Sequence, residues 1–308
     1  MPILNPKYFM QNRYMRFLLF LFSLAFLPFS ALAQQNSNAL LWEVKGKNLK
    51  KPSYLFGTYH LLTNRFLDSL PVIGQKFDAA EALVGEVVLD SAALAKMTAT
   101  MAPGTKTLDQ VLSPEDYAMV SAELKKLINV GLEPFNQYNP MTVNLLLYQF
   151  LLQKSMPQPQ YKDRELGMDM YLQQLALSKK KTLKGLETVD VQLHALFGQY
   201  SESRQAEMLV DFVKNIDKNR DEVVQSIHCY KKQDLICLDK MIYDATYKPQ
   251  ELETLLYSRN RNWLKLLPTQ MAQQSSFIAV GAGHLTGKDG LVEGLRKQGY
   301  TVTPVKLK

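Results

Sequence analysis

The chain has 308 residues, of which 46% are hydrophobic and 21% charged, so it is long and apolar enough to fold around a full core. Ordinary counts of 15 glycines and 14 prolines exclude collagen-like and low-complexity classes. The formal net charge is +7, and three of the cations (Lys7, Arg13 and Arg16) lie within the first 33 residues, so the remaining charge does not indicate nucleic-acid binding.

The first 33 residues have the pattern of a secretory signal peptide. A basic start without acids is followed by an apolar run from Phe17 to Phe29 and then by Ala31-Leu32-Ala33, the small-x-small pattern that signal peptidase reads. The run is shorter than the roughly 20 apolar residues that span a bilayer, and no later stretch has membrane-spanning character. We therefore predict cleavage after Ala33 and a periplasmic or secreted protein without a membrane anchor.

Residues 34–308 predict a single α/β domain with strands at both ends of the chain and in the middle. We expect a central mixed sheet built from an N-terminal hairpin, middle strands and C-terminal strands. Helical patterns fill two large insertions, at about 90–180 and 189–270. The predicted strands are 40–45, 53–58, 82–89, 182–186, 276–281 and 300–305, and the helices beside them are 69–80 and 289–298.

The two cysteines, Cys229 and Cys237, lie in a segment with the pattern of a turn between two helices. In an oxidising compartment this arrangement favours a disulfide, and two free buried thiols are the alternative. Two cysteines alone cannot form a structural zinc site.

Two of the four histidines share the local pattern Gly-x-x-His, and each follows a predicted strand. The first is Gly57-Thr58-Tyr59-His60-Leu61, and the second is Gly281-Ala282-Gly283-His284-Leu285. Ligands of open α/β sheets bind beyond the carboxyl ends of the strands, and glycines there allow a sharp turn and a close approach. We therefore expect His60 and His284 to share one site, although a single histidine in such a turn is usually structural.

Glu86 interrupts the otherwise apolar run Leu83–Val88. A buried carboxylate is costly unless it is paired or bound to a metal. Two histidines and one glutamate at three strand ends would bind one divalent ion and leave positions for water and substrate. The alternative is that Glu86 faces solvent on an edge strand.

Three other polar residues are candidates for chemistry. Arg259 and Asn260 lie on a helical stretch before the late strand, where a helix surface is the alternative. Glu187 follows the strand at 182–186 and is either an acid at a helix N-terminus or a site carboxylate. His194 and His228 have no patterned partner, which favours a surface or core position.

Together these segments resemble the TraB/GumN family, which includes the Tiki metalloproteases. The resemblance implies an α/β fold similar to ChaN and the erythromycin esterases, and a peptidase that depends on a divalent metal, with manganese or cobalt expected and zinc as a further option. The matching segments are Leu41–Leu61, Glu86, Gly185-Leu186-Glu187-Thr188 with Gln192, Arg259-Asn260, Val280–Leu291 and Gly299-Tyr300.

We therefore expect an exported metal-dependent hydrolase that cleaves a peptide or protein substrate, with His60, Glu86 and His284 as metal ligands. Glu86 is the expected base if it is not a ligand, and Glu187 is the base if it is. Arg259 or Asn260 is expected to stabilise the developing negative charge. The alternatives are a non-catalytic periplasmic protein that binds metal or haem, and a secreted interaction module with a vestigial site.

Overall fold

The computed structural model describes residues 38–47, 49–60, 62–101, 106–155, 166–244 and 247–307. The predicted signal peptide, residues 1–33, lies outside these ranges, and so does Leu61 of the first Gly-x-x-His segment. Within the described ranges, no helix combines the length and the hydropathy that a membrane span requires.

Six strands form one mixed sheet in the order β4-β3-β5-β2-β1-β6. The neighbours β4, β3, β5 and β2 run parallel, whereas β1 is antiparallel to both β2 and β6. The predicted α/β fold, with a central sheet drawn from both ends and the middle of the chain, is confirmed. The strands are β1 (Leu41–Lys45), β2 (Ser53–Thr58), β3 (Ala82–Gly85), β4 (Thr182–Gly185), β5 (Ser276–Gly281) and β6 (Thr301–Pro304).

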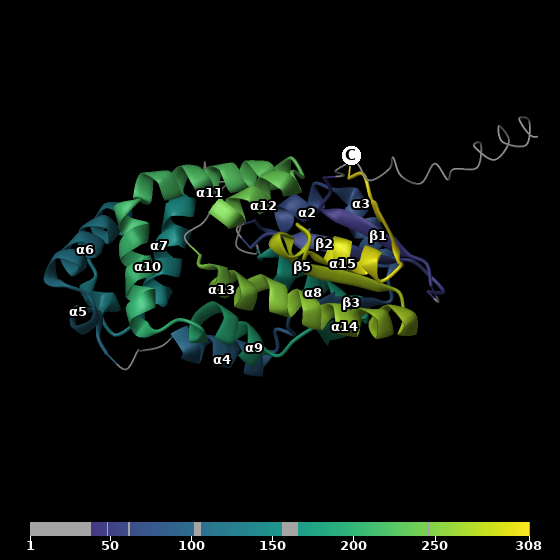
Figure 1. The fold of residues 1–308 in the computed structure, drawn as a ribbon, viewed down its shortest axis with the longest axis horizontal. Coiled ribbons are helices and arrows are strands. Elements are labelled where there is room, and N and C mark those ends of the chain that lie inside the picture. The colour runs from purple at the N-terminus through teal and green to yellow at the C-terminus, as the bar shows by residue number, and fades with distance from the viewer. Residues whose placement is uncertain are drawn as a thin grey trace, which may run out of the picture. The chain divides into compact units, whose positions relative to one another are not determined.

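Helices form most of the rest of the described chain (Figure 1). They are α2 (Asn64–Asp68), α3 (Pro71–Ala79), α4 (Ser91–Met101), α5 (Leu108–Val111), α6 (Pro114–Ile128), α7 (Pro140–Ser155), α8 (Met168–Ser178), α9 (Val189–Leu193), α10 (Glu202–Lys214), α11 (Ile216–Lys231), α12 (Leu235–Asp244), α13 (Pro249–Leu252), α14 (Ser258–Gln273) and α15 (Leu291–Lys297).

Both faces of the sheet are covered by helices. On one face, Phe77 of α3 packs edge-on against Phe277 of β5, with ring centroids 5.4 Å apart. On the opposite face, Lys184 of β4 donates hydrogen bonds to Gln270 and Gln273 of α14. Strands covered on both faces contain continuous apolar runs, and every residue of β2 is buried accordingly.

Helices α5, α6, α7 and α10 enclose a second hydrophobic core, and Figure 1 shows them beside one another, away from the strands. Local signals explain where α6 begins. The Ser113 hydroxyl accepts a hydrogen bond from the Asp116 N–H at 3.1 Å, and Pro114 occupies the first helical position. Val120 and Leu124 then recur at helical spacing and are buried in this core.

The predicted disulfide between Cys229 and Cys237 is present and joins α11 to α12, with the two Cα atoms 5.9 Å apart. The cysteines flank the turn between these helices, as predicted. Ile242 of α12 packs against Gly283, so the helix held by the disulfide supports the turn that carries His284.

The strand predicted over 82–89 is shorter than expected, because β3 ends at Gly85. Beyond β3, the backbone forms hydrogen bonds with a side chain where a strand would pair with its neighbour. Gln173 of α8 donates to the Val87 carbonyl at 3.0 Å and accepts from the Leu89 N–H at 2.9 Å. Glu86 therefore lies just past a strand end, not within a strand. The other strands begin and end within one residue of their predicted limits.

Candidate functional site

The carboxyl ends of the four parallel strands meet at one edge of the sheet, and a polar candidate follows each of them. His60 follows β2, Glu86 follows β3, Glu187 follows β4 and His284 follows β5. Parallel pairing explains why residues from four distant segments reach the same edge.

Gly281, the last residue of β5, marks the point where three of these side chains meet. Its N–H donates to Glu86 Oε1 at 2.8 Å. A methyl group built on Gly281 would lie 3.4 Å from that oxygen, 3.7 Å from His60 Nε2 and 3.7 Å from His284 Cδ2. The structure thus brings together the three predicted metal ligands, although they come from opposite ends of the chain.

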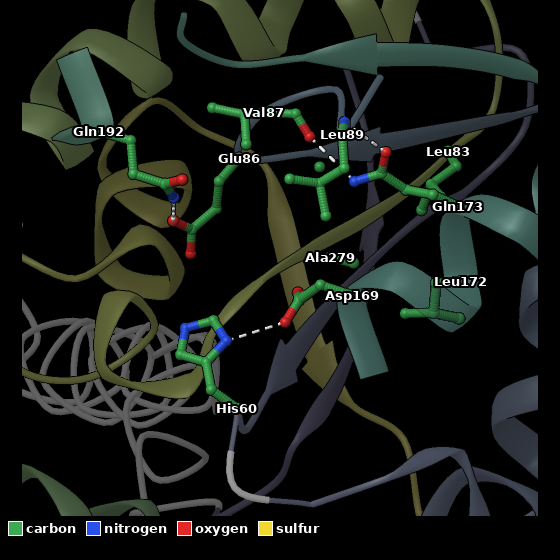
Figure 2. Close-up of a pocket in the computed structure, with 11 residues that line it drawn as sticks. His60, Leu83, Glu86, Val87, Leu89, Asp169, Leu172, Gln173, Gln192 and Ala279 are labelled. Atoms are coloured by element: carbon green, nitrogen blue, oxygen red, sulfur yellow. Dashed lines mark hydrogen bonds and ion pairs between the residues drawn. The ribbon is translucent and has the colours of Figure 1, made fainter. Parts of the chain in front are cut away.

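Glu86 is buried, and the strand that it follows, β3, lies between β4 and β5, so the edge-strand alternative is excluded. Its Oε2 accepts hydrogen bonds from Gln192 Nε2 at 2.9 Å, drawn in Figure 2, and from Arg259 Nη2 at 2.6 Å. Burial alone would raise the pKa of this carboxyl. The neighbouring His284, Arg259 and His60 outweigh burial and lower the pKa to about 2, so Glu86 is ionised at neutral pH.

Arg259 connects the buried groups of the site. Its Nη2 also donates to Glu187 at 2.6 Å, and its Nη1 donates to His284 Nε2 at 3.2 Å. The residue follows a π-helical turn, Glu253–Tyr257, and a second Nη1 hydrogen bond reaches the Leu255 carbonyl within that turn at 2.9 Å. Turns of this kind often occur at functional sites. Arg259 is 5% exposed, which excludes the helix-surface alternative.

Glu187 pairs with Arg259 beside Glu86, whereas Thr188 caps the following helix and Asp190 is the acid in its first turn. The indole N–H of Trp263 donates to Glu187 Oε2 at 3.1 Å, and the Arg259 guanidinium lies 4.8 Å from the centre of the same indole ring. Burial raises the pKa of Glu187 in spite of Arg259, so this carboxylate accepts a proton more readily than Glu86 does.

His284 is neutral and is held by Asn260. Burial lowers the pKa of His284 to about 3, so the ring is neutral. Because the Arg259 guanidinium can only donate, Nε2 carries the lone pair and Nδ1–H donates to Asn260 Oδ1, with the heavy atoms 2.7 Å apart. The Asn260 amide nitrogen donates to the carbonyls of His284 and Asp289. Because Asn260 is 1% exposed and its amide is engaged in these contacts, its geometry favours positioning of His284 over direct contact with a substrate.

His60 contacts a residue that the sequence did not predict. Its Nδ1 lies 2.9 Å from Asp169 Oδ2, as Figure 2 shows. This hydrogen bond raises the pKa of His60 to about 9. An ion would therefore displace a proton from Nε2 at neutral pH, which is usual for metal-binding side chains. The remaining histidines, His194 and His228, are exposed and lie outside this site.

A pocket of about 100 Å³ opens beside these groups and is lined by both polar and apolar residues. This volume admits an ion with a few waters, since a water occupies about 30 Å³ in the liquid. The polar lining residues are His60, Glu86, Asp169, Gln173 and Gln192, and the apolar ones include Leu83, Leu172 and Ala279 (Figure 2).

The donor set fits a divalent ion, provided that one hydrogen bond breaks. Two imidazoles and a carboxylate suit zinc, manganese or cobalt. Glu86 Oε1 lies 3.8 Å from His284 Nε2, within the span of two donors that bind one ion at about 2.1 Å each. Among the described residues, no three His, Cys, Asp or Glu side chains are already arranged to hold a metal. Arg259 Nη1 donates a hydrogen bond to the lone pair of His284 Nε2, and this bond would have to break before His284 could bind an ion.

Three residues that contact Glu86, His60 or Glu187 were not among the predicted site residues. Gln192 was part of the family pattern without an assigned role, whereas Asp169 and Trp263 had no signal in local spacing. Asp169 opens a helix far along the chain from His60, and an acid there has the ordinary pattern of a first-turn residue.

Comparisons with known proteins find relatives that are named metalloproteases. The chain is 23% identical over 316 residues to metalloprotease TIKI1 of Danio rerio, a match that covers 87% of this chain and 63% of the relative. It is 25% identical over 317 residues to TIKI1 of Xenopus tropicalis and 24% identical over 317 residues to TIKI1 of Homo sapiens, covering 87% of this chain and 62% of the relative in both cases.

The chain therefore spans less than two thirds of the length of these relatives. No solved structure is a significant match. The model of the TraB/PrgY/gumN family matches residues 40–304, which include every strand and every candidate ligand, and the chain belongs to this family.

Proposed function

We propose that the protein is an exported hydrolase that depends on a divalent metal and cleaves peptide bonds. The observation that carries the proposal is the meeting of His60, Glu86 and His284 around Gly281. The similarity to relatives named metalloproteases supports a metal-dependent protease. Manganese, cobalt or zinc is proposed as the ion, because two imidazoles and a carboxylate suit these metals.

Each proposed ligand directs one donor atom toward this point. His284 Nε2 must first lose its hydrogen bond from Arg259, and Glu86 Oε1 also accepts from the Gly281 N–H. His60 and His284 would bind through Nε2, since Nδ1 of each ring is already hydrogen-bonded. Glu86 would bind through Oε1, because Oε2 accepts from Gln192 and Arg259. When bound, such an ion lowers the pKa of a water molecule and polarises the scissile carbonyl.

The remaining groups take complementary roles. With Glu86 assigned as a ligand, Glu187 is the proposed proton acceptor, because burial already raises its pKa. Arg259 is the proposed donor to the substrate oxygen, through the Nη1–H that faces His284 Nε2. A preorganised donor of this kind contributes roughly 2.7–4 kcal/mol to transition-state stabilisation.

Metal analysis and a peptide-cleavage screen test this proposal together. We expect the purified protein to bind manganese, cobalt or zinc and to cleave at least one peptide, and His60→Ala to weaken metal binding sharply and to abolish cleavage. Arg259→Ala should reduce kcat far more than metal occupancy. Loss of metal in the Arg259 variant, or full turnover by it, would contradict the assigned role.

A protein that binds metal but cleaves no peptide would instead support the non-catalytic alternative. Haem is a poor fit for this pocket, since about 100 Å³ is far below the roughly 300–1,000 Å³ of typical cofactor sites.

Export is proposed from the leader pattern alone. The basic start, the apolar run and Ala31-Leu32-Ala33 favour cleavage after Ala33. N-terminal sequencing of the periplasmic or secreted product should begin at Gln34, and an intact Met1 on that product would contradict cleavage.

A further inference from the structure

Asp169 binds two side chains at the end of β2. Its Oδ1 accepts a hydrogen bond from the Thr58 hydroxyl at 2.8 Å, and its Oδ2 accepts one from His60 Nδ1 at 2.9 Å. Thr58 is the last residue of the strand, and His60 follows it in the turn. A single carboxylate from α8 thus holds both the strand end and the exposed histidine beyond it.

This carboxylate does not serve its own helix in the usual way. An acid in a first turn commonly caps free N–H groups of that helix. Here the N-cap residue is Gly167, and no side-chain hydrogen bond caps α8. Each Asp169 oxygen instead accepts from a residue at the end of β2, which indicates a role at the sheet edge.

His60 needs such a partner more than His284 does. The His284 ring is buried, and both Trp263 and Asn260 contact it. The His60 side chain is 69% exposed, so little packing restricts its rotation. Among the described residues, the hydrogen bond that orients its ring comes from Asp169, and it leaves Nε2 on the side of Gly281.

We infer that Asp169, supported by Thr58, is a positioning residue that holds the His60 ring with Nε2 toward Glu86 and His284, ready to bind a divalent ion. This inference rests on the proposed metal-dependent function. A carboxylate that accepts from the second nitrogen of a ligand histidine fixes the ring and increases its basicity, and loss of such a partner typically lowers metal affinity 10–100-fold.

The test is a double-mutant cycle on the Co²⁺ affinity of the purified protein, measured by titration calorimetry. We expect Asp169→Asn to weaken binding about 10–100-fold. In a His60→Ala background the same substitution should have no further effect, because Asp169 acts through His60. Asp169→Glu keeps the carboxylate and should recover part of the loss.

Asp109→Asn is the matched control, since it removes an acid from the first turn of α5, which packs in the helical core away from the strands. We expect it to leave Co²⁺ affinity unchanged. Thermal unfolding without cobalt shows which variants fold. If Asp169→Asn does not fold, Thr58→Val removes only the supporting hydrogen bond and should weaken binding less, but in the same direction.

The outcomes separate this inference from the function on which it rests. Equal Co²⁺ affinities of wild type and Asp169→Asn, with His60→Ala weakened, would overturn the role of Asp169 and leave the metal site standing. A further loss of affinity when Asp169→Asn is added to His60→Ala would also overturn that role. A wild-type protein that binds neither Co²⁺, Mn²⁺ nor Zn²⁺ would refute the metal site itself, and this inference with it.

Discussion

Replacing Arg259 by methionine should strongly destabilise the metal-free protein. Methionine keeps much of the side-chain volume but removes the positive charge that Glu86 and Glu187 share. The side chains of the two glutamates are 9% and 5% exposed, so neither carboxylate can be solvated in place. Removal of one partner from a buried ion pair typically costs 3–5 kcal/mol.

Thermal unfolding measures this loss. For a domain of this size, 1 kcal/mol shifts Tm by about 2–4 °C, so the expected decrease is roughly 6–20 °C. Arg261→Met is the matched control on the same helix, because Arg261 is 56% exposed and pairs with an exposed Glu253. An exposed ion pair contributes about 0–1 kcal/mol, so the control should melt close to wild type.

Cobalt should raise the Tm of Arg259→Met more than that of wild type. A divalent ion replaces the lost positive charge, and Nη1 no longer competes for the His284 lone pair. Adding Glu187→Gln to Arg259→Met should recover part of the metal-free stability, since it removes one unpaired carboxylate. A difference of less than about 1 kcal/mol in the free energy of unfolding between Arg259→Met and Arg261→Met, or about 2–4 °C in Tm, would contradict this prediction.

Three further predictions follow from single features of the structure. Gly281→Ala should leave Tm nearly unchanged, because the backbone φ of −51° is one that alanine adopts without strain. It should weaken Co²⁺ binding, since the new methyl group lies among the proposed ligands. Unchanged Co²⁺ affinity would contradict that placement. Serine at both Cys229 and Cys237 should lower the free energy of unfolding by about 2–3 kcal/mol in urea, and an unchanged midpoint would show that the crosslink contributes little. Burial alone would raise the pKa of Glu251, but its hydrogen bond with Arg204 lowers it below 4.5. This stabilisation is therefore fully present above about pH 4.5 and is lost as the pH falls below it, so the difference in unfolding free energy between wild type and Glu251→Gln should shrink in acid; a constant difference would rule out this linkage.

The candidate ligands were predictable from the sequence because each lies at a strand end with a local signal. Gly-x-x-His after two strands identified His60 and His284, and a lone acid in an apolar run identified Glu86. Parallel strands present their carboxyl ends at one edge, so strand pattern alone predicted that these residues would meet.

The roles within the site were less predictable. Either Arg259 or Asn260 was expected as the donor to the developing negative charge. The structure shows that the Asn260 amide is engaged with His284 and nearby carbonyls, whereas Arg259 binds Glu86, Glu187 and His284 together. The chain positions of two adjacent residues on a helix do not reveal which neighbours each one contacts.

By itself, the sequence determined the strands and the polar residues that follow them. Strands β2 and β5 occupy the predicted residues 53–58 and 276–281, because apolar runs, glycines and turn residues act on the neighbouring backbone. Only the tertiary structure decided that Asp169 holds His60, that Gln173 binds the backbone beyond β3, and that Arg259 donates to the lone pair of a proposed ligand. These are hydrogen bonds between residues far apart in the chain. They depend on strand order and on how helices pack against the sheet, which no local pattern encodes.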